Sequence, residues 1–131
     1  MKILAVTCAT GGAEDVEMTT KAATTLMASN LKGIEVYNLL TAQELDGEPK
    51  GFHAILRSPA NRGFAWGMNA ALYYGTGARL PERFDYALIY NNDIVFESPG
   101  WLQQLLSADP EFYPAIFAPM TTFTSQPRQV S

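Results

Sequence analysis

The sequence predicts an α/β fold in which helices cover both faces of a mostly parallel sheet, a three-layer αβα arrangement. First, short apolar stretches alternate along the chain with stretches of helical period. Second, the opening run, residues 2–8, is almost unbroken in its apolar character, as expected of a strand that is covered on both faces. Third, 47% of the 131 residues are hydrophobic, which supplies a core for one domain.

The individual elements follow from the spacing of apolar residues. Val16, Thr20 and Ala23 recur three or four positions apart, and Phe64 and Met68 begin a second stripe of the same period. Strands are expected near residues 2–7, 34–38, 53–56, 85–90 and 115–118, helices near 14–30, 64–75 and 99–107, and a charged loop over 41–51. These elements form one domain over residues 1–120, and residues 121–131 form a polar tail.

Composition excludes several function classes. The formal charge is −4 and no basic cluster exceeds two residues, so duplex nucleic acid is not an expected partner. The single cysteine and single histidine exclude an intrachain disulfide and the usual zinc motifs. No apolar run is long enough to span a bilayer. We therefore expect a cytoplasmic protein, and attachment to a membrane through a partner remains open.

Three polar clusters follow predicted strands, at Thr7–Gly12, Ser58–Gly63 and Asn91–Asp93. In a parallel α/β sheet, ligands bind outside the carboxyl ends of the strands. We therefore expect the three clusters to meet at one edge of the sheet and to form the binding site there.

The cluster Asn91-Asn92-Asp93 has two open interpretations. Carboxylate and amide oxygens suit Mg²⁺ or Mn²⁺ held jointly with substrate phosphates. Asn and Asp are also ordinary turn residues, because their side chains bond to nearby backbone.

The cluster Asn61-Arg62-Gly63 precedes a predicted helix, where polar or anionic ligand groups are favoured. Arg62 is a candidate to pair with a base carbonyl or a phosphate, and a solvated arginine beside an ordinary turn is the alternative. Asn69, within that helix, either contacts a ligand, holds the preceding loop, or is exposed.

The first cluster does not match two familiar nucleotide-binding loops. Gly11-Gly12 lacks the spacing of a dinucleotide fingerprint or a P-loop, and acids follow it. Cys8 is expected to act as a small hydrophobic residue, since a catalytic thiol would need His53 as its base.

Taken together, these pieces resemble the family 2 glycosyltransferases, and the rhamnosyltransferase-like branch in particular. The resemblance is carried by the run from Asn61 to Leu72, the strand and cluster from Asp85 to Asp93, the opening Pro99-Gly100-Trp101-Leu102, and Ala115 to Pro119. It covers residues 55–120 well and the first strand and helix only in outline.

The resemblance implies a GT-A fold and a glycosyltransferase that takes its sugar from a nucleotide-diphosphate donor, such as a UDP- or dTDP-sugar. It implies that Asp93 binds Mn²⁺ or Mg²⁺, with Asn91 and Asn92 near the ribose and diphosphate. Arg62 and Gly63 would border the nucleotide, and Thr7, Cys8 and Ala9 would form part of the base pocket. The acceptor, whether carbohydrate, lipid-linked or other, is unknown.

The chain departs from the family pattern in two places. The family usually carries an aspartate after its second strand, and here Asn38 is the candidate substitute. The family also continues past the last expected strand into a region that holds the general base. Glu97, Asp109 and Glu111 do not match that residue, so no catalytic residue is assigned.

The chain is therefore interpreted as a short or truncated donor-binding half. One alternative is a non-catalytic nucleotide-sugar-binding module that lacks the acceptor half. A sugar nucleotidyltransferase is disfavoured, because Gly11–Asp15 lacks the arginine of that signature. Apolar surface near the acceptor side would then support self-association or a partner segment, with candidate lining residues Trp66, Trp101, Phe112, Tyr113 and Phe117.

Overall fold

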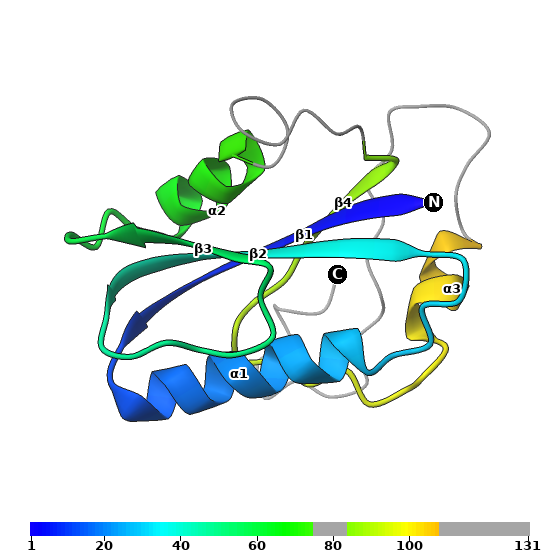
Figure 1. Ribbon diagram of the computed structural model, residues 1–131, viewed down its shortest axis with the longest axis horizontal. Coiled ribbons are helices and arrows are strands. Elements are labelled where there is room, and N and C mark those ends of the chain that lie inside the picture. The colour runs from blue at the N-terminus through cyan, green and yellow to red at the C-terminus, as the bar shows by residue number, and fades with distance from the viewer. Residues whose placement is uncertain (75–83, 108–131) are drawn as a thin grey trace, which may run out of the picture.

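The computed structural model describes residues 1–74 and 84–107, which form an α/β domain around a four-stranded parallel sheet. The strand order is β3-β2-β1-β4, so β1 is central (Figure 1). The elements in chain order are β1 (Lys2–Gly11), α1 (Ala13–Met27), β2 (Glu35–Leu45), β3 (Ala54–Ser58), α2 (Phe64–Tyr73), β4 (Tyr86–Ile89) and α3 (Trp101–Leu106).

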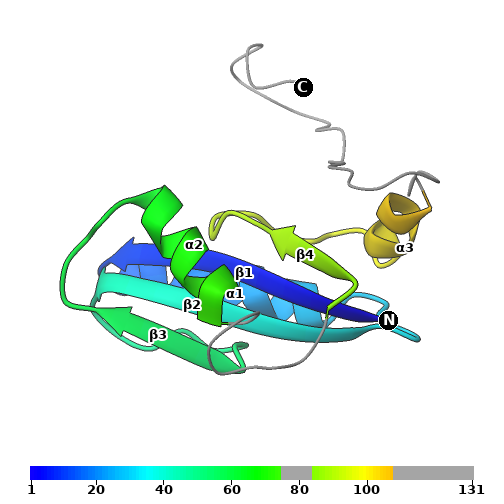
Figure 2. The ribbon, with the colours of Figure 1, turned by 90° about the horizontal axis from the view of Figure 1, so that it is seen from above.

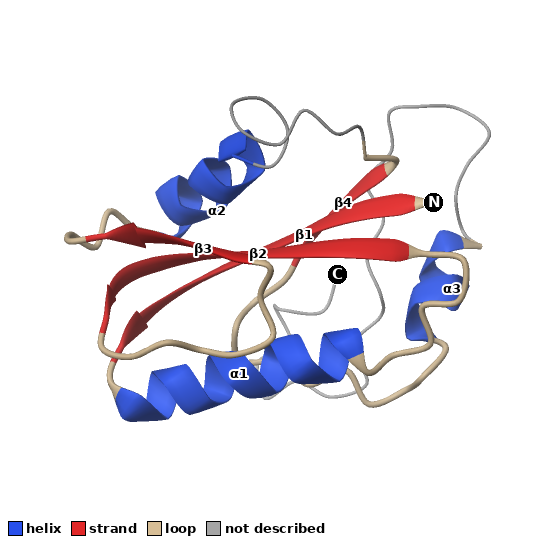
Figure 3. Cartoon of the chain, in the orientation of Figure 1, coloured by secondary structure: helices blue, strands red, loops and turns tan. Residues whose placement is uncertain are grey.

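The helices lie on both faces of the sheet, as the sequence predicts. Figure 3 shows α1 below the strands and α2 above them, and Figure 2 shows the same arrangement from above. On the α1 face, Ile3 and Ala5 of β1 pack with Leu26 of α1 and Leu102 of α3. The alternate residues of β1 point to the opposite face of the sheet and form a separate core with α2. A strand covered on both faces must be apolar at successive positions, which explains the unbroken run in β1.

Several element boundaries differ from the sequence-based expectation. The loop expected over 41–51 is wrong for its first part, because β2 continues to Leu45. The charges and polar residues there suggested a loop, yet Thr41 and Gln43 are buried against α2. The first helix ends at Met27, earlier than predicted. The strand expected at 115–118 and the tail 121–131 lie outside the described residues.

A buried polar bridge ties β4 to β2 across the central strand. The hydroxyl of Tyr90 donates to Oδ1 of Asn38 at 2.7 Å, and Nδ2 of Asn38 donates to the carbonyl of Gly51 at 3.0 Å. The backbone N–H of Asn38 donates to Nδ1 of His53 at 2.9 Å. Ala5 lies opposite Asn38 in the sheet register, and its small side chain leaves room for the tyrosine to cross β1.

This bridge places a titratable group in the core. Burial raises the pKa of Tyr90 well above its ordinary value, and the hydrogen bond to Asn38 lowers it by a smaller amount. The fold therefore favours the neutral phenol.

Among the helices within residues 1–74 and 84–107, none combines the length and the apolar character needed to cross a membrane.

Replacing Tyr90 by Phe is expected to lower the free energy of unfolding by about 1–3 kcal/mol, because Oδ1 of Asn38 is then buried without a donor. Urea unfolding of both proteins measures the difference. Tyr73→Phe is the matched control, since Tyr73 is 69% exposed and its hydroxyl is accessible to water. Equal losses in the two variants would mean that the Tyr90–Asn38 bond contributes nothing.

Unfolding free energy should fall as pH rises above about 10, the ordinary tyrosine pKa. The folded state holds the Tyr90 proton more tightly than the unfolded chain, so alkaline solution favours unfolding. Unfolding measured at a series of alkaline pH values tests this. The slope should be smaller in Tyr90→Phe, and an identical slope in both proteins would assign the alkaline effect to other groups.

Candidate functional site

A pocket of about 300 Å³ lies at the carboxyl end of the sheet, and segments that follow three strands line it. β1 pairs with β4 only as far as Val6, whereas its pairing with β2 continues to Gly11. Within residues 1–74 and 84–107, the last residues of β1 therefore have no strand paired on their β4 side, and the pocket lies there. Its described lining residues are Cys8, Ala9, Thr10, Asp15, Met18, Gln43, Asn61, Gly63, Phe64 and Asn92.

This pocket occupies the crevice between β1 and β4, where the chain connections leave the sheet in opposite directions. α1 leads from β1 to β2 on one face, and α2 leads from β3 to β4 on the other. In open α/β sheets such a switch point is the usual place for a ligand. The position of the pocket is therefore a consequence of strand order.

Gln43 holds the wall that follows β3. Its Oε1 accepts the backbone N–H of Arg62 at 2.7 Å, and its Nε2 donates to the carbonyl of Gly63 at 2.9 Å. Within the turn, Oδ1 of Asn61 accepts the N–H of Gly63 at 3.0 Å. Gly63 has φ +94°, a conformation that favours glycine. One buried amide thus satisfies the backbone of the turn before α2 and places Asn61 in the pocket.

The first turns of α2 approach the sheet closely at Gly67. The hydroxyl of Thr41 donates to the Gly67 carbonyl at 2.7 Å. A Cβ at position 67 would lie 2.6 Å from Nε2 of Gln43 and 2.8 Å from Cβ of Cys8. Glycine is therefore required here because the helix lies directly on β1 and β2.

Cys8 lines the pocket as a protonated thiol. Burial raises its pKa, and its Sγ donates a weak hydrogen bond to the carbonyl of Phe64 at 3.9 Å. His53 is committed to the N–H of Asn38, and it is not among the described lining residues. These contacts agree with the expectation that Cys8 packs as a small hydrophobic residue.

The α1 side of the pocket is formed by Asp15 and Met18, and Asn92 is attached to it. Nδ2 of Asn92 donates to Oγ1 of Thr19 at 3.0 Å, and the Thr19 hydroxyl donates to the backbone carbonyl of Asp15 at 2.6 Å. Oδ2 of Asp15 accepts the N–H of Gly12 at 3.0 Å. Asp15 thus caps its own helix while it faces the pocket.

The segment after β4 is held along α1 by further hydroxyl groups. Oγ1 of Thr25 accepts the N–H of Phe96 at 3.1 Å, and Oγ of Ser29 accepts Nε1 of Trp101 at 2.9 Å. Each hydroxyl gives its own proton to a helix carbonyl one turn earlier, so its lone pairs are available to accept. This row of contacts fixes residues 92–101 and, with them, one wall of the pocket.

The structure brings together five of the residues named from the sequence. Cys8, Ala9, Asn61, Gly63 and Asn92 all line the pocket.

The other named residues lie elsewhere. Thr7 is fully buried on the α1 face, and its Oγ1 has no hydrogen-bond partner among the described residues. Asn38 is also fully buried, and both ends of its amide are bonded to protein. Arg62, Asn69, Asn91 and Asp93 are exposed. The guanidinium of Arg62 lies 5.1 Å from the centre of the Trp66 ring, a cation–π contact.

The sequence analysis named Thr10 only as part of the cluster Thr7–Gly12, and it missed Asp15, Met18, Gln43 and Phe64 as lining residues. The sequence showed Asp15 only as one of the acids that follow Gly11-Gly12, and the helix dipole favours acids in a first turn whether or not they bind a ligand. Gln43 fell in a segment predicted as a loop. Its alternation with Thr41 was the available signal, because both point to the face that α2 covers.

The described residues contain no group of three or more His, Cys, Asp or Glu side chains placed to hold a metal ion. Asp93 is an exposed carboxylate that follows Asn92 in the chain. This donor set fits a Mg²⁺ or Mn²⁺ ion only where substrate phosphates and water complete the coordination.

Gln43→Glu is expected to lower the free energy of unfolding by about 1–3 kcal/mol, because a carboxylate cannot donate to the Gly63 carbonyl and is buried there. Amide hydrogen exchange at Arg62 should also become faster as the turn loosens. Gln104→Glu, on the exposed side of α3, is the matched control. If exchange at Arg62 and stability both stay unchanged, Gln43 does not hold the turn.

Comparison with known proteins identifies no relative: no protein-family model, no curated protein and no solved structure matches this chain.

Proposed function

We propose that the chain is a GT-A-type glycosyltransferase domain that binds a nucleotide-diphosphate sugar in the pocket beside β1. One observation carries the proposal. The last residues of β1 and residues that follow β3 and β4 converge on a single pocket in the crevice between β1 and β4. The segments after β3 and β4 are ones whose sequence resembles the donor-binding motifs of family 2 glycosyltransferases, and β1 resembles that family in outline.

The sheet supports this proposal at a coarser level. An all-parallel order of β3-β2-β1-β4 with helices on both faces matches the order of the first four strands of a doubly wound nucleotide-binding fold. The pocket volume of about 300 Å³ is at the lower end of the range for small-molecule sites. It suits one part of a nucleotide sugar, with the rest extending over the rim.

Arg62 and Asp93 are the charged groups that we assign to the rim. Arg62 is adjacent in sequence to the lining residues Asn61 and Gly63, and its exposed guanidinium can form charge-assisted bonds to a diphosphate. Asp93 follows the lining residue Asn92 and would hold Mg²⁺ or Mn²⁺ together with that diphosphate. A metal bound there supplies positive charge to the leaving diphosphate.

Calorimetric titration with UDP and dTDP, in Mn²⁺ and then in chelator, tests the proposal. Binding should be tighter with metal, and Asp93→Asn should remove most of that difference. Arg62→Ala should weaken nucleotide binding by roughly 1.5–3 kcal/mol.

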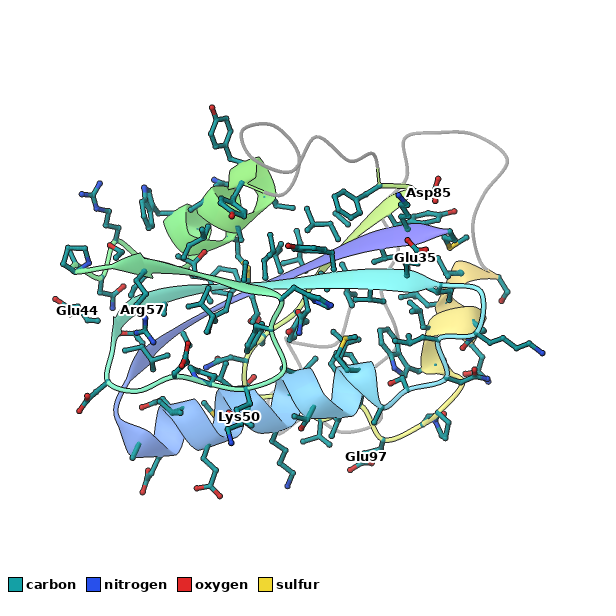
Figure 4. The ribbon with its side chains drawn as sticks, in the orientation of Figure 1. Glu35, Glu44, Lys50, Arg57, Asp85 and Glu97 are labelled. Carbon is teal, nitrogen blue, oxygen red and sulfur yellow. The ribbon has the colours of Figure 1, made fainter. Side chains whose placement is uncertain are left out.

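Glu97→Gln is the control for Asp93. Figure 4 places Glu97 below α1, far from the end of the sheet where Glu44 and Arg57 lie. Lys21→Ala, on the exposed side of α1, is the control for Arg62.

An assay of UDP-sugar hydrolysis then separates two outcomes. Turnover supports a glycosyltransferase, whereas tight donor binding without turnover supports a non-catalytic nucleotide-sugar-binding module. A protein that binds neither nucleotide, with or without metal, contradicts the proposal.

A further inference from the structure

We infer that the outer side of α2 is a self-association surface, through which two copies of this chain form a weak dimer with two-fold symmetry. This inference goes beyond the proposed function and does not rest on it.

The outer side of α2 lacks the charged residues expected where a helix faces solvent. A helix that covers a sheet normally carries charged and polar residues on its opposite side. α1 follows this rule, because its exposed positions include Glu14, Glu17 and Lys21. In contrast, no residue from 63 to 74 is charged. Exposed apolar surface of this kind marks a contact with another molecule.

The outward residues of α2 form one stripe, which consists of Trp66, Asn69, Ala70 and Tyr73. Their spacing of i, i+3, i+4 and i+7 is the pattern of a helix face that packs against a neighbour. This face lies opposite Met68 and Ala71, which are buried toward the sheet. Trp66 is 39% exposed and Tyr73 is 69% exposed. Among residues 1–74 and 84–107, Figure 3 shows no helix or strand on that side of α2.

The stripe is symmetric about its own midpoint, which lies between Asn69 and Ala70. In an antiparallel pair of α2 helices with a two-fold axis at this midpoint, Trp66 of each copy lies beside Tyr73 of the other. Two aromatic contacts then form at the ends, and the small side chains at the centre let the helices approach closely. The Asn69 amide has both donor and acceptor atoms, so it can bond to its own copy across the axis. A second copy of the chain therefore matches every position of the stripe.

Charge also favours a second copy over a charged partner. The chain has a formal charge of −4, so two copies repel each other as a whole, but contact at this stripe brings no carboxylates together. The guanidinium of Arg62 lies 5.1 Å from the centre of the Trp66 ring and leaves Trp66 partly exposed. A charged partner would find no matching charge among the four stripe residues.

The size of the stripe determines the strength of the dimer. α2 has 10 residues, and at about 1.5 Å per residue a helix of this length is about 15 Å long. A standard interface buries about 800 Å² per partner, which is more than three helical turns offer. The dimer is therefore expected to have a Kd between about 1 μM and 1 mM.

A dimer of this kind leaves the pocket open. Phe64 lines the pocket, and its spacing places it on the same side of α2 as Met68 and Ala71, away from the stripe. Contact between the two stripes therefore does not cover Phe64.

Sedimentation velocity of the full chain over a series of concentrations tests the dimer. The wild-type protein should shift from monomer to dimer as its concentration rises. Tyr73→Glu should raise the Kd of the dimer by about 10-fold or more, because the carboxylate would then lie against Trp66 of the other copy. The exposure of Tyr73 means that the monomer should stay folded, which circular dichroism checks.

Val95→Glu is the matched control. Val95 is also an exposed apolar residue, but it lies in the segment after β4 and outside α2. The same change of chemistry at this position should leave the Kd of the dimer at its wild-type value.

Cross-linking tests the symmetry of the pair. In a Cys8→Ala background, Asn69→Cys should form a disulfide-linked dimer under mild oxidation, because the two-fold axis brings position 69 close to its own copy. Lys21→Cys, at an exposed position of α1, is the control and should give little linked dimer.

A protein that stays monomeric at every concentration up to about 1 mM overturns the inference. A dimer that Tyr73→Glu leaves unchanged, or that Tyr73→Glu and Val95→Glu weaken equally, overturns it too, because another surface then forms the contact. Equal cross-linking through positions 69 and 21 excludes the two-fold arrangement. None of these results bears on nucleotide binding, so the glycosyltransferase proposal stands or falls by its own titration.

Discussion

The site depends on one buried side chain, the amide of Gln43. It accepts from the N–H of Arg62 and donates to the carbonyl of Gly63, which also accepts the N–H of Gly67 in the first turn of α2. Because both amide atoms are used, the side chain fixes the position and the orientation of the turn before α2. Gly67 allows the helix to approach closely enough for this contact. The position of the pocket wall and the packing of α2 therefore both depend on the hydrogen bonds of Gln43.

The opposite face of the sheet is also organised by polar contacts. Tyr90 reaches across the central strand to Asn38, so β4 and β2 are coupled although β1 separates them. Beyond β4, the hydroxyls of Thr19, Thr25 and Ser29 replace the strand partners that residues 92–101 lack. Polar residues on both faces thus position segments that apolar packing alone would leave without a defined register.

These two sets of contacts explain how a small pocket acquires a definite polarity. Residues of α1 and the segment after β4 present acceptors, and the turn before α2 presents a donor. The groups that suit phosphate and metal are exposed and lie outside the described pocket lining. A ligand with a neutral, hydroxyl-bearing part and an anionic part would place its neutral part in the pocket. Its anionic part would then lie against the exposed groups outside the pocket.

The order of helices and strands was determined by the sequence alone, because hydrophobic periodicity is a local property of the chain. The convergence of the clusters after β1, β3 and β4 also followed, since parallel strands have their carboxyl ends at one edge. The tertiary structure decided which polar residues are buried. Thr41 and Gln43 extend β2 because their partners are the carbonyls of Gly67 in α2 and of its N-cap Gly63, which lie 26 and 20 positions away. Asn38 became a core residue and Asp15 a pocket residue in the same way. Such partners depend on how the helices and strands pack together, and a local sequence pattern does not indicate that packing.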